Sequence, residues 1–292
     1  MKAIIGGGAT AAIAILAALP AAAAARPTVV PSSAERSTTV PAGGARSLTI
    51  TCPADAVALH AAAVRLPRGV RIADSSPARD VRRWSMRFAS VASRARRVRA
   101  TLRCVRLRVP AGISDVTLRV STSSRGMLRV PAGRSVEVPL QCAPGFVPAG
   151  QGVGAGTRAV SVSAAVPNRN GWVFRIENNG KSAAAASVRI RCLRRVVRGR
   201  REGAITRLRF DVKHVTFSVP IRSGRSRSFT GSCARDRFSL GTGISIDRTA
   251  DITLLRSFPF GRREGSWLLR NRGAAEPVSG YLLCLSRASR FR

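Results

Sequence analysis

The residues best suited to chemistry in this sequence are its six cysteines, which fall into three pairs of similar spacing. Within successive pairs, 52, 50 and 51 residues separate the two cysteines. Six cysteines allow 15 pairings, and the regular spacing selects one disulfide within each pair. The sequence therefore predicts three disulfides, which are Cys52–Cys104, Cys142–Cys192 and Cys233–Cys284.

Metal binding and catalysis are the alternatives for these and other reactive residues. The sequence contains no C-x-x-C, and its histidines are His60 and His214, so we predict no metal and no cofactor. Neither histidine belongs to a motif, and no G-x-S-x-G is present, so both are interpreted as surface or packing residues. Gly152-x-Gly154-x-Gly156 lacks the Lys-Ser/Thr of a phosphate loop and is interpreted as a flexible turn. We expect a protein that is not an enzyme.

Arginine is the other chemical signal. Lysine and arginine number 50 against 14 acidic residues, giving a formal net charge of +36. Alternate arginines on a strand project to one face and form a ladder that can bind phosphates bidentately. Such a ladder fits anionic cell-envelope polymers, anionic lipid headgroups or extracellular DNA as partners; the alternative is a solvated charged face that reflects a preference for GC-rich codons. The candidate residues are Arg94, Arg96, Arg97, Arg99 and Arg103 in one stretch and Arg189, Arg191, Arg194, Arg195 and Arg198 in another.

The elements that must position these residues recur with the cysteines. Each cysteine pair encloses one of the three tryptophans, Trp84, Trp172 and Trp267, and a tryptophan at the same place in each unit indicates a core residue more than a ligand platform. Apolar and polar residues alternate before the cysteines, as in Val98-Arg99-Ala100-Thr101-Leu102-Arg103-Cys104, which is typical of half-buried strands. The best candidate for a helix or turn is the alanine-rich stretch 57–64.

These patterns predict an all-β protein. Each unit is expected to be a small β-sandwich, similar in size to an immunoglobulin domain, with one internal disulfide. Three such sandwiches would follow one another in tandem. The expected division is a signal peptide at 1–25, a lead-in linker at 26–36, and repeats at 37–112, 113–203 and 204–292.

The second unit resembles a loosely defined repeat of secreted actinobacterial proteins. That repeat runs V-P-A-G, then C-P-x-G with a glycine-rich stretch, then G-W, an asparagine and a closing cysteine. The resemblance rests on Val130-Pro131-Ala132-Gly133, Cys142-Ala143-Pro144-Gly145, Gly150, Gly152, Gly171-Trp172, Asn178-Asn179 and Cys192. The first unit departs from the pattern with Arg83-Trp84, and the third with Ser266-Trp267. The resemblance implies export and a repeated architecture, and it implies no reaction.

The N-terminus has the order of features found in a secretory signal peptide. Lys2 precedes an apolar stretch, and small residues at 21–25 supply a cleavage site; a retained membrane anchor is the alternative. Export to an oxidising compartment agrees with the predicted disulfides. We therefore expect a secreted or cell-surface-associated protein with a structural or adhesive role, or, as the alternative, an electrostatic binder of extracellular polyanions.

Overall fold

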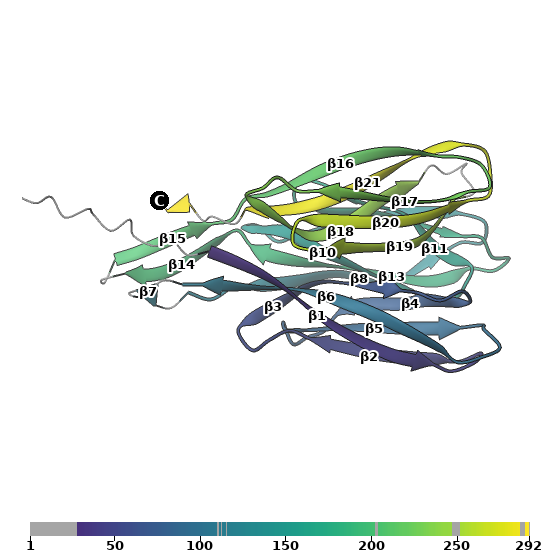
Figure 1. Cartoon of the computed structure of the whole chain (residues 1–292), viewed down its shortest axis with the longest axis horizontal. Coiled ribbons are helices and arrows are strands. Elements are labelled where there is room, and N and C mark those ends of the chain that lie inside the picture. The colour runs from purple at the N-terminus through teal and green to yellow at the C-terminus, as the bar shows by residue number, and fades with distance from the viewer. Residues whose placement is uncertain are drawn as a thin grey trace, which may run out of the picture.

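The chain is organised as strands and turns throughout the part that its structure describes. That structure is a computed structural model, and it describes residues 28–109, 111, 113–114, 116–201, 204–246, 252–286 and 290–291, among which there is no helix (Figure 1). The fold is therefore all-β, as predicted. The expected signal peptide at 1–25 lies outside the described residues.

The strands recur in three sets of six with the same connectivity. In each set the first, last and third strands form one sheet, and the second, fifth and fourth form another. The first unit contains β1 (Thr28–Val40), β2 (Ala45–Thr51), β3 (Ala56–Arg65), β4 (Val70–Pro77), β5 (Arg83–Ser90) and β6 (Arg96–Arg108). The second contains β8 (Val120–Val130), β9 (Ser135–Gln141), β10 (Phe146–Ala155), β11 (Val160–Pro167), β12 (Gly171–Asn178) and β13 (Ala184–Arg194). The third contains β16 (Val212–Ile221), β17 (Ser226–Ser232), β18 (Arg237–Ile246), β19 (Ile252–Phe260), β20 (Glu264–Asn271) and β21 (Glu276–Ser286).

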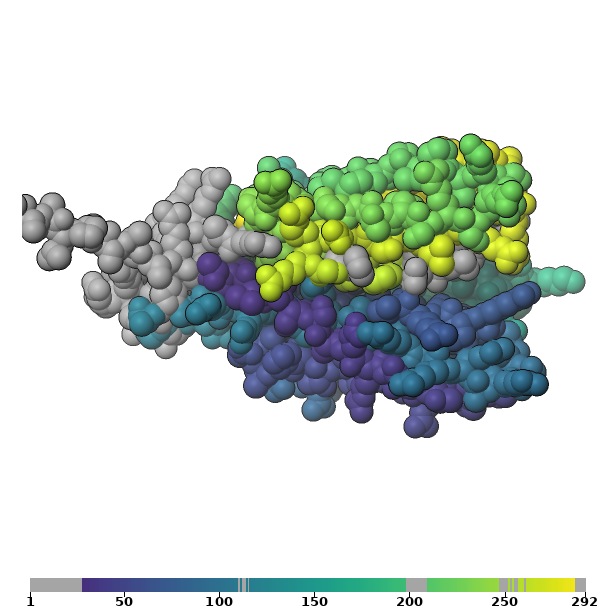
Figure 2. Space-filling view, in the orientation of Figure 1, coloured from purple at the N-terminus to yellow at the C-terminus, as the bar shows by residue number. Residues whose placement is uncertain are grey.

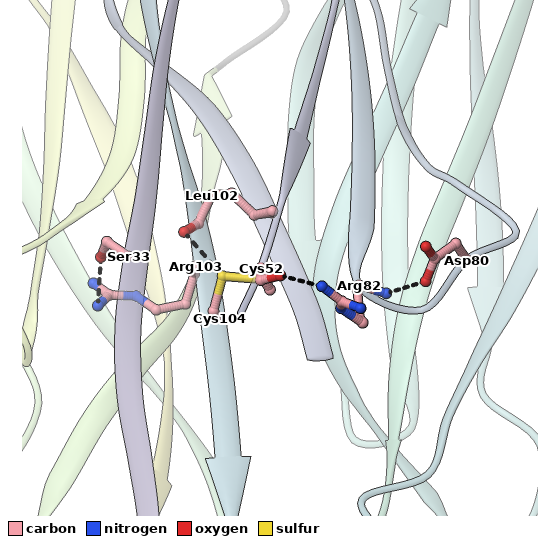
Figure 3. The surroundings of a disulfide bond; sticks show 7 residues. All are labelled: Ser33, Cys52, Asp80, Arg82, Leu102, Arg103 and Cys104. Carbon is pink, nitrogen blue, oxygen red and sulfur yellow. Dashed lines mark hydrogen bonds between the residues drawn. A yellow bond between two sulfur atoms is a disulfide. The ribbon is translucent and has the colours of Figure 1, made fainter. Parts of the chain in front are cut away.

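One disulfide links the two sheets within each unit. In the first unit Cys52 directly follows β2, and it bonds to Cys104 in the middle of β6 (Figure 3). The other two bonds occupy the same places and join Cys142 to Cys192 and Cys233 to Cys284. The observed bonds confirm the predicted pairing. They can form because the alternation of side chains along the strands turns each cysteine toward the inner face.

The prediction of three separate β-sandwiches in tandem is wrong, because the units share sheets. β4 of the first unit pairs with β10 of the second, which creates one six-stranded sheet in the order β2-β5-β4-β10-β13-β8. β11 of the second unit pairs with β18 of the third in an equivalent six-stranded sheet. β19 of the third unit lies beside β3 of the first. The three units therefore close into a ring, and no unit has a complete surface of its own.

The ring gives a propeller-like arrangement of sheets around a common axis. The third strands of the units, β3, β10 and β18, contact one another at this axis. Each has a bulge at the equivalent place, at Leu59, Ala149 and Leu240, and all three residues are fully buried. The backbones approach so closely that a Cβ built on Gly150 would lie 1.8 Å from the carbonyl oxygen of Leu59.

A separate four-stranded sheet lies at one end of the molecule and contains segments that connect the units together with a short strand that follows the third unit (Figure 1). Its strands are β7 (Ile113–Ser114), β14 (Val196–Arg201), β15 (Ala204–Arg209) and β22 (Arg290–Phe291). The boundary expected after residue 203 therefore falls within the connection between β14 and β15. The lead-in linker expected at 26–36 lies largely in β1, which pairs along its whole length with β6.

Candidate functional site

Two of the candidate arginines are buried where units meet. Arg103 on β6 donates hydrogen bonds to Ser33 Oγ, to Ser239 Oγ at 3.3 Å and to the carbonyl oxygen of Gly261 at 2.6 Å (Figure 3 shows Ser33 and Arg103). Ser239 and Gly261 belong to the third unit, so Arg103 joins the first unit to the last. A buried arginine that already has these partners cannot form part of a surface ladder.

Arg191 on β13 has the equivalent role one unit later. It donates to Thr122 Oγ1 at 3.0 Å and to the carbonyl oxygen of Ala78, in the turn after β4 of the first unit, at 3.3 Å. Burial lowers the pKa of Arg103 and of Arg191 to about 10 in each case, and the charge of Asp80 opposes the shift at Arg191. Both guanidinium groups remain protonated at neutral pH and serve as buried donors between units.

The remaining candidates do not form one face. Arg94, Arg96 and Arg97 lie exposed at the start of β6, whereas Arg194 and Arg195 lie exposed at the end of β13. The ends of β6 and β13 lie near each other, because β7 and β14, which follow them, pair in the four-stranded sheet. The two arginine groups therefore occupy opposite ends of the molecule.

Two further candidates are engaged in ion pairs. Arg99 pairs with Glu35 on the neighbouring β1, and Arg189 pairs with Asp74 at 3.2 Å across the junction of the first two units. The side chain of Arg198 lies outside the described residues. The structure thus disperses the predicted ladder among a unit interface, two ends of the molecule and local ion pairs.

The histidines and tryptophans have structural positions. All three tryptophans have an exposed fraction of 0%, which agrees with a role in the core. His60 is buried beside the axis, where its equivalents are Gly150 and Gly241, while His214 is exposed on β16. Among the described residues, no group of three or more His, Cys, Asp or Glu side chains is placed to hold a metal ion.

A groove at the junction of the first two units is the strongest candidate for a binding site. It lies on the outer face of the first six-stranded sheet, has a volume of about 390 Å³, and has a floor of alanines and glycines that includes Ala73, Gly154 and Gly156. Gly152, Gly154 and Gly156 belong to β10 and its end, so their interpretation as a flexible turn is wrong. The charged residues lining the groove are Arg71, Arg87, Arg189 and Asp74.

Positive charge in this groove exceeds negative charge. Asp74 is engaged by Arg189 and by the Ser76 hydroxyl, which donates at 2.9 Å. The pKa of Arg71 is lowered by its partial burial and by the like charges of Arg158 and Arg87. The Nε atom of Arg71 is buried and has no hydrogen-bond partner in the structure. An anion placed here would relieve both the repulsion and the missing hydrogen bond.

Sequence reasoning missed this groove because its residues are isolated from one another in the sequence. Arg71 and Arg87 lie on two strands of the first unit, while the glycines and Arg189 come from the second. The alternation along each strand could show that these residues point outward, but nothing in the sequence showed that β4 pairs with β10. The high density of arginines near β6 and β13 instead led to the prediction of a binding surface on those two strands.

Two findings bear on the setting of the protein and its relationships. No helix among the described residues is long and apolar enough to cross a membrane, and three disulfides are consistent with an oxidising compartment. No protein-family model matches the chain, and no curated protein matches its sequence.

Proposed function

We propose that this protein is a non-enzymatic, extracellular binding protein that adheres to polyanions through its surface arginines. The observation that carries the proposal is the charge balance: if every one of the 14 acidic side chains neutralised one basic side chain, 36 positive charges would still remain. Buried arginines such as Arg103 and Arg191 account for few of them. The remainder creates a positive field that attracts anionic polymers and surfaces.

The fold supports an adhesive role because it offers a stiff body for multivalent contact. Sheets that continue from unit to unit and a disulfide inside each unit limit relative motion of the exposed arginines. The space-filling view shows the third unit packed along the length of the first (Figure 2). Charges at fixed positions along such a body can contact one long anion at several points, which raises avidity.

A salt titration tests the proposal. The purified, disulfide-bonded protein is mixed with an anionic polymer such as polyphosphate, and the association constant is measured between about 50 and 200 mM salt. We expect the constant to fall steeply, by tenfold or more, because each phosphate contact releases condensed counterions. Absence of binding at low salt would exclude polyanion adhesion and leave a purely structural role.

A further inference from the structure

The outer face of the first six-stranded sheet carries a row of polar side chains interrupted by glycine. The strand register places Arg87 on β5 opposite Asp74 on β4, Asp74 opposite Gly154 on β10, and Gly154 opposite Ser187 on β13. A Cβ built on Gly154 would lie 2.5 Å from Asp74 Oδ1 and 2.6 Å from Ser187 Oγ. The absence of a side chain at this position therefore opens the groove and exposes two oxygen atoms along it.

Arg71 completes a pair of guanidinium groups at one end of this row. It lies opposite Ala89, two residues along β5 from Arg87, so the two arginines are diagonal neighbours on one face of the sheet. Each can bind a phosphate with two parallel N–H donors. The unpartnered Nε of Arg71 is a buried donor already present within this pair.

The opposite side of the groove is formed by an exposed lip. Met127 lies there with an exposed fraction of 87%, and its φ of 50° is unusual for a residue other than glycine. A strained backbone of this kind costs of the order of 1 kcal/mol or more and is concentrated at binding sites. The lip and the alanines of the floor add apolar contact area beside the arginines.

The equivalent junction between the second and third units lacks these features. There Ser161 stands in place of Arg71, Ala164 in place of Asp74, and Ser245 in place of Gly154. The counterpart of Arg87 is Arg175, which is neutralised by Glu137 at 3.1 Å. The charged groove is thus a property of the first junction and does not follow from the shared architecture.

We propose that this groove binds a phosphate ester that carries hydroxyl groups, such as one segment of a phosphodiester-linked polyol. The phosphate lies between Arg71 and Arg87, and neighbouring hydroxyls donate to Asp74 and exchange hydrogen bonds with Ser187. A carboxylate polymer without hydroxyl groups, such as polyglutamate, matches the groove less well, because each carboxylate has fewer oxygens for two guanidinium forks and the polymer has no hydroxyl for Asp74. This inference rests on the proposed function, for which it names a preferred anion and a place.

The test compares a groove variant with a variant of equal charge elsewhere. R71Q/R87Q removes the arginine pair, while R222Q/R225Q removes two exposed arginines from the turn between β16 and β17 of the third unit. Binding of a short glycerol phosphate oligomer is measured by calorimetry at fixed salt. We expect affinity to fall at least tenfold in the groove variant and less than threefold in the control.

Nuclear magnetic resonance of the unaltered protein gives an independent readout that needs no substitution. Titration with the oligomer is expected to shift the amide signals of Gly154, Gly156 and Ala185 before those of the third unit. Inorganic phosphate is expected to reproduce the shifts weakly, glycerol to produce none, and polyglutamate to spread shifts over the surface. Vesicles containing phosphatidylglycerol show whether a lipid headgroup can supply the same chemistry.

The outcomes separate the site from the general function. Equal losses in the two variants, or shifts spread evenly over the protein, would overturn the groove while polyanion adhesion stands. Failure of the unaltered protein to bind any anionic polymer at low salt would overturn both. Equal affinity for polyglutamate and the glycerol phosphate oligomer would overturn the ligand class.

Discussion

The residue before the second cysteine is buried in all three units, although its side chain is charged in two of them and apolar in the third. Arg103 and Arg191 are 2% exposed, and so is Leu283 at the equivalent position of the third unit. The two arginines donate hydrogen bonds to backbone carbonyl oxygens of a neighbouring unit, whereas the leucine fills the same space with an apolar side chain. The position requires a long side chain, and its charge is secondary. This explains why alternation along the sequence marked Arg103 and Arg191 as outward-facing, although a second unit covers them.

Because His60 is buried, we expect the free energy of unfolding to decrease in mild acid. Burial lowers its pKa from the usual 6.5 to about 4, although a hydrogen bond with the backbone of Gln151 opposes the shift. Between these values the unfolded chain binds a proton that the folded protein excludes, so unfolding becomes easier as pH falls from about 6.5 to about 4 and this effect levels off below. The full loss is roughly 3 kcal/mol. Urea unfolding across this range measures it.

The matched variant for this test is His60→Gln, which has a side chain that does not titrate. Its free energy of unfolding is expected to change much less between pH 6.5 and 4 than that of the unaltered protein. An identical pH dependence in both proteins would show that other groups cause the acid sensitivity.

At the scale of the element, the third strand of each unit is the part of the sequence that is hardest to interpret. Stretch 57–64, the best candidate for a helix or turn, belongs to β3, and nearly all of that strand is buried. A strand covered on both faces loses the alternation of apolar and polar residues that identifies half-buried strands. The second strands, and the last strands over part of their length, keep one exposed face, so the inward direction of their cysteines and the disulfides could be predicted. The sequence therefore indicated the outer elements well and the central ones poorly.

Close approach of these central strands predicts that Gly150 cannot be replaced. In Gly150→Ala the new Cβ would collide with the backbone of Leu59, which cannot move without disturbing the axis. We expect destabilisation of about 4 kcal/mol or more, measured by thermal unfolding. Gly126→Ala is the control, because a Cβ there meets nothing within 4 Å. Similar stability of the two variants would contradict the packing at the axis.

At the scale of the whole molecule, shared sheets predict a single cooperative unfolding transition. Opening one unit would break the pairing of β4 with β10 or of β11 with β18 and would leave apolar edges exposed. Scanning calorimetry of the disulfide-bonded protein is expected to give one peak whose calorimetric and van't Hoff enthalpies agree. Three resolved transitions would instead indicate independent domains.

The limits of sequence interpretation are clearest at this scale. Spacing of the cysteines identified three units and their internal bonds, because each bond depends on strands of the same unit. Strand pairing between units depends on which edges meet in space, and no local pattern encodes it. The prediction of tandem sandwiches was wrong for this reason, and the burial of Arg103 and Arg191 between units was missed for the same reason. The groove containing Arg71 and Arg87 was missed for the same reason, because half of it comes from the next unit.

The contact between the first and last units has a consequence for biosynthesis. Arg103 bonds to the carbonyl of Gly261, 158 residues later in the chain, and β3 lies against β19. The ribosome synthesises the first unit long before β19, so the nascent chain must carry an uncovered strand edge until β19 emerges. Such an edge can recruit strands from other molecules. Prematurely terminated chains are therefore expected to aggregate, and the full-length chain to depend on a chaperone until its last strands emerge.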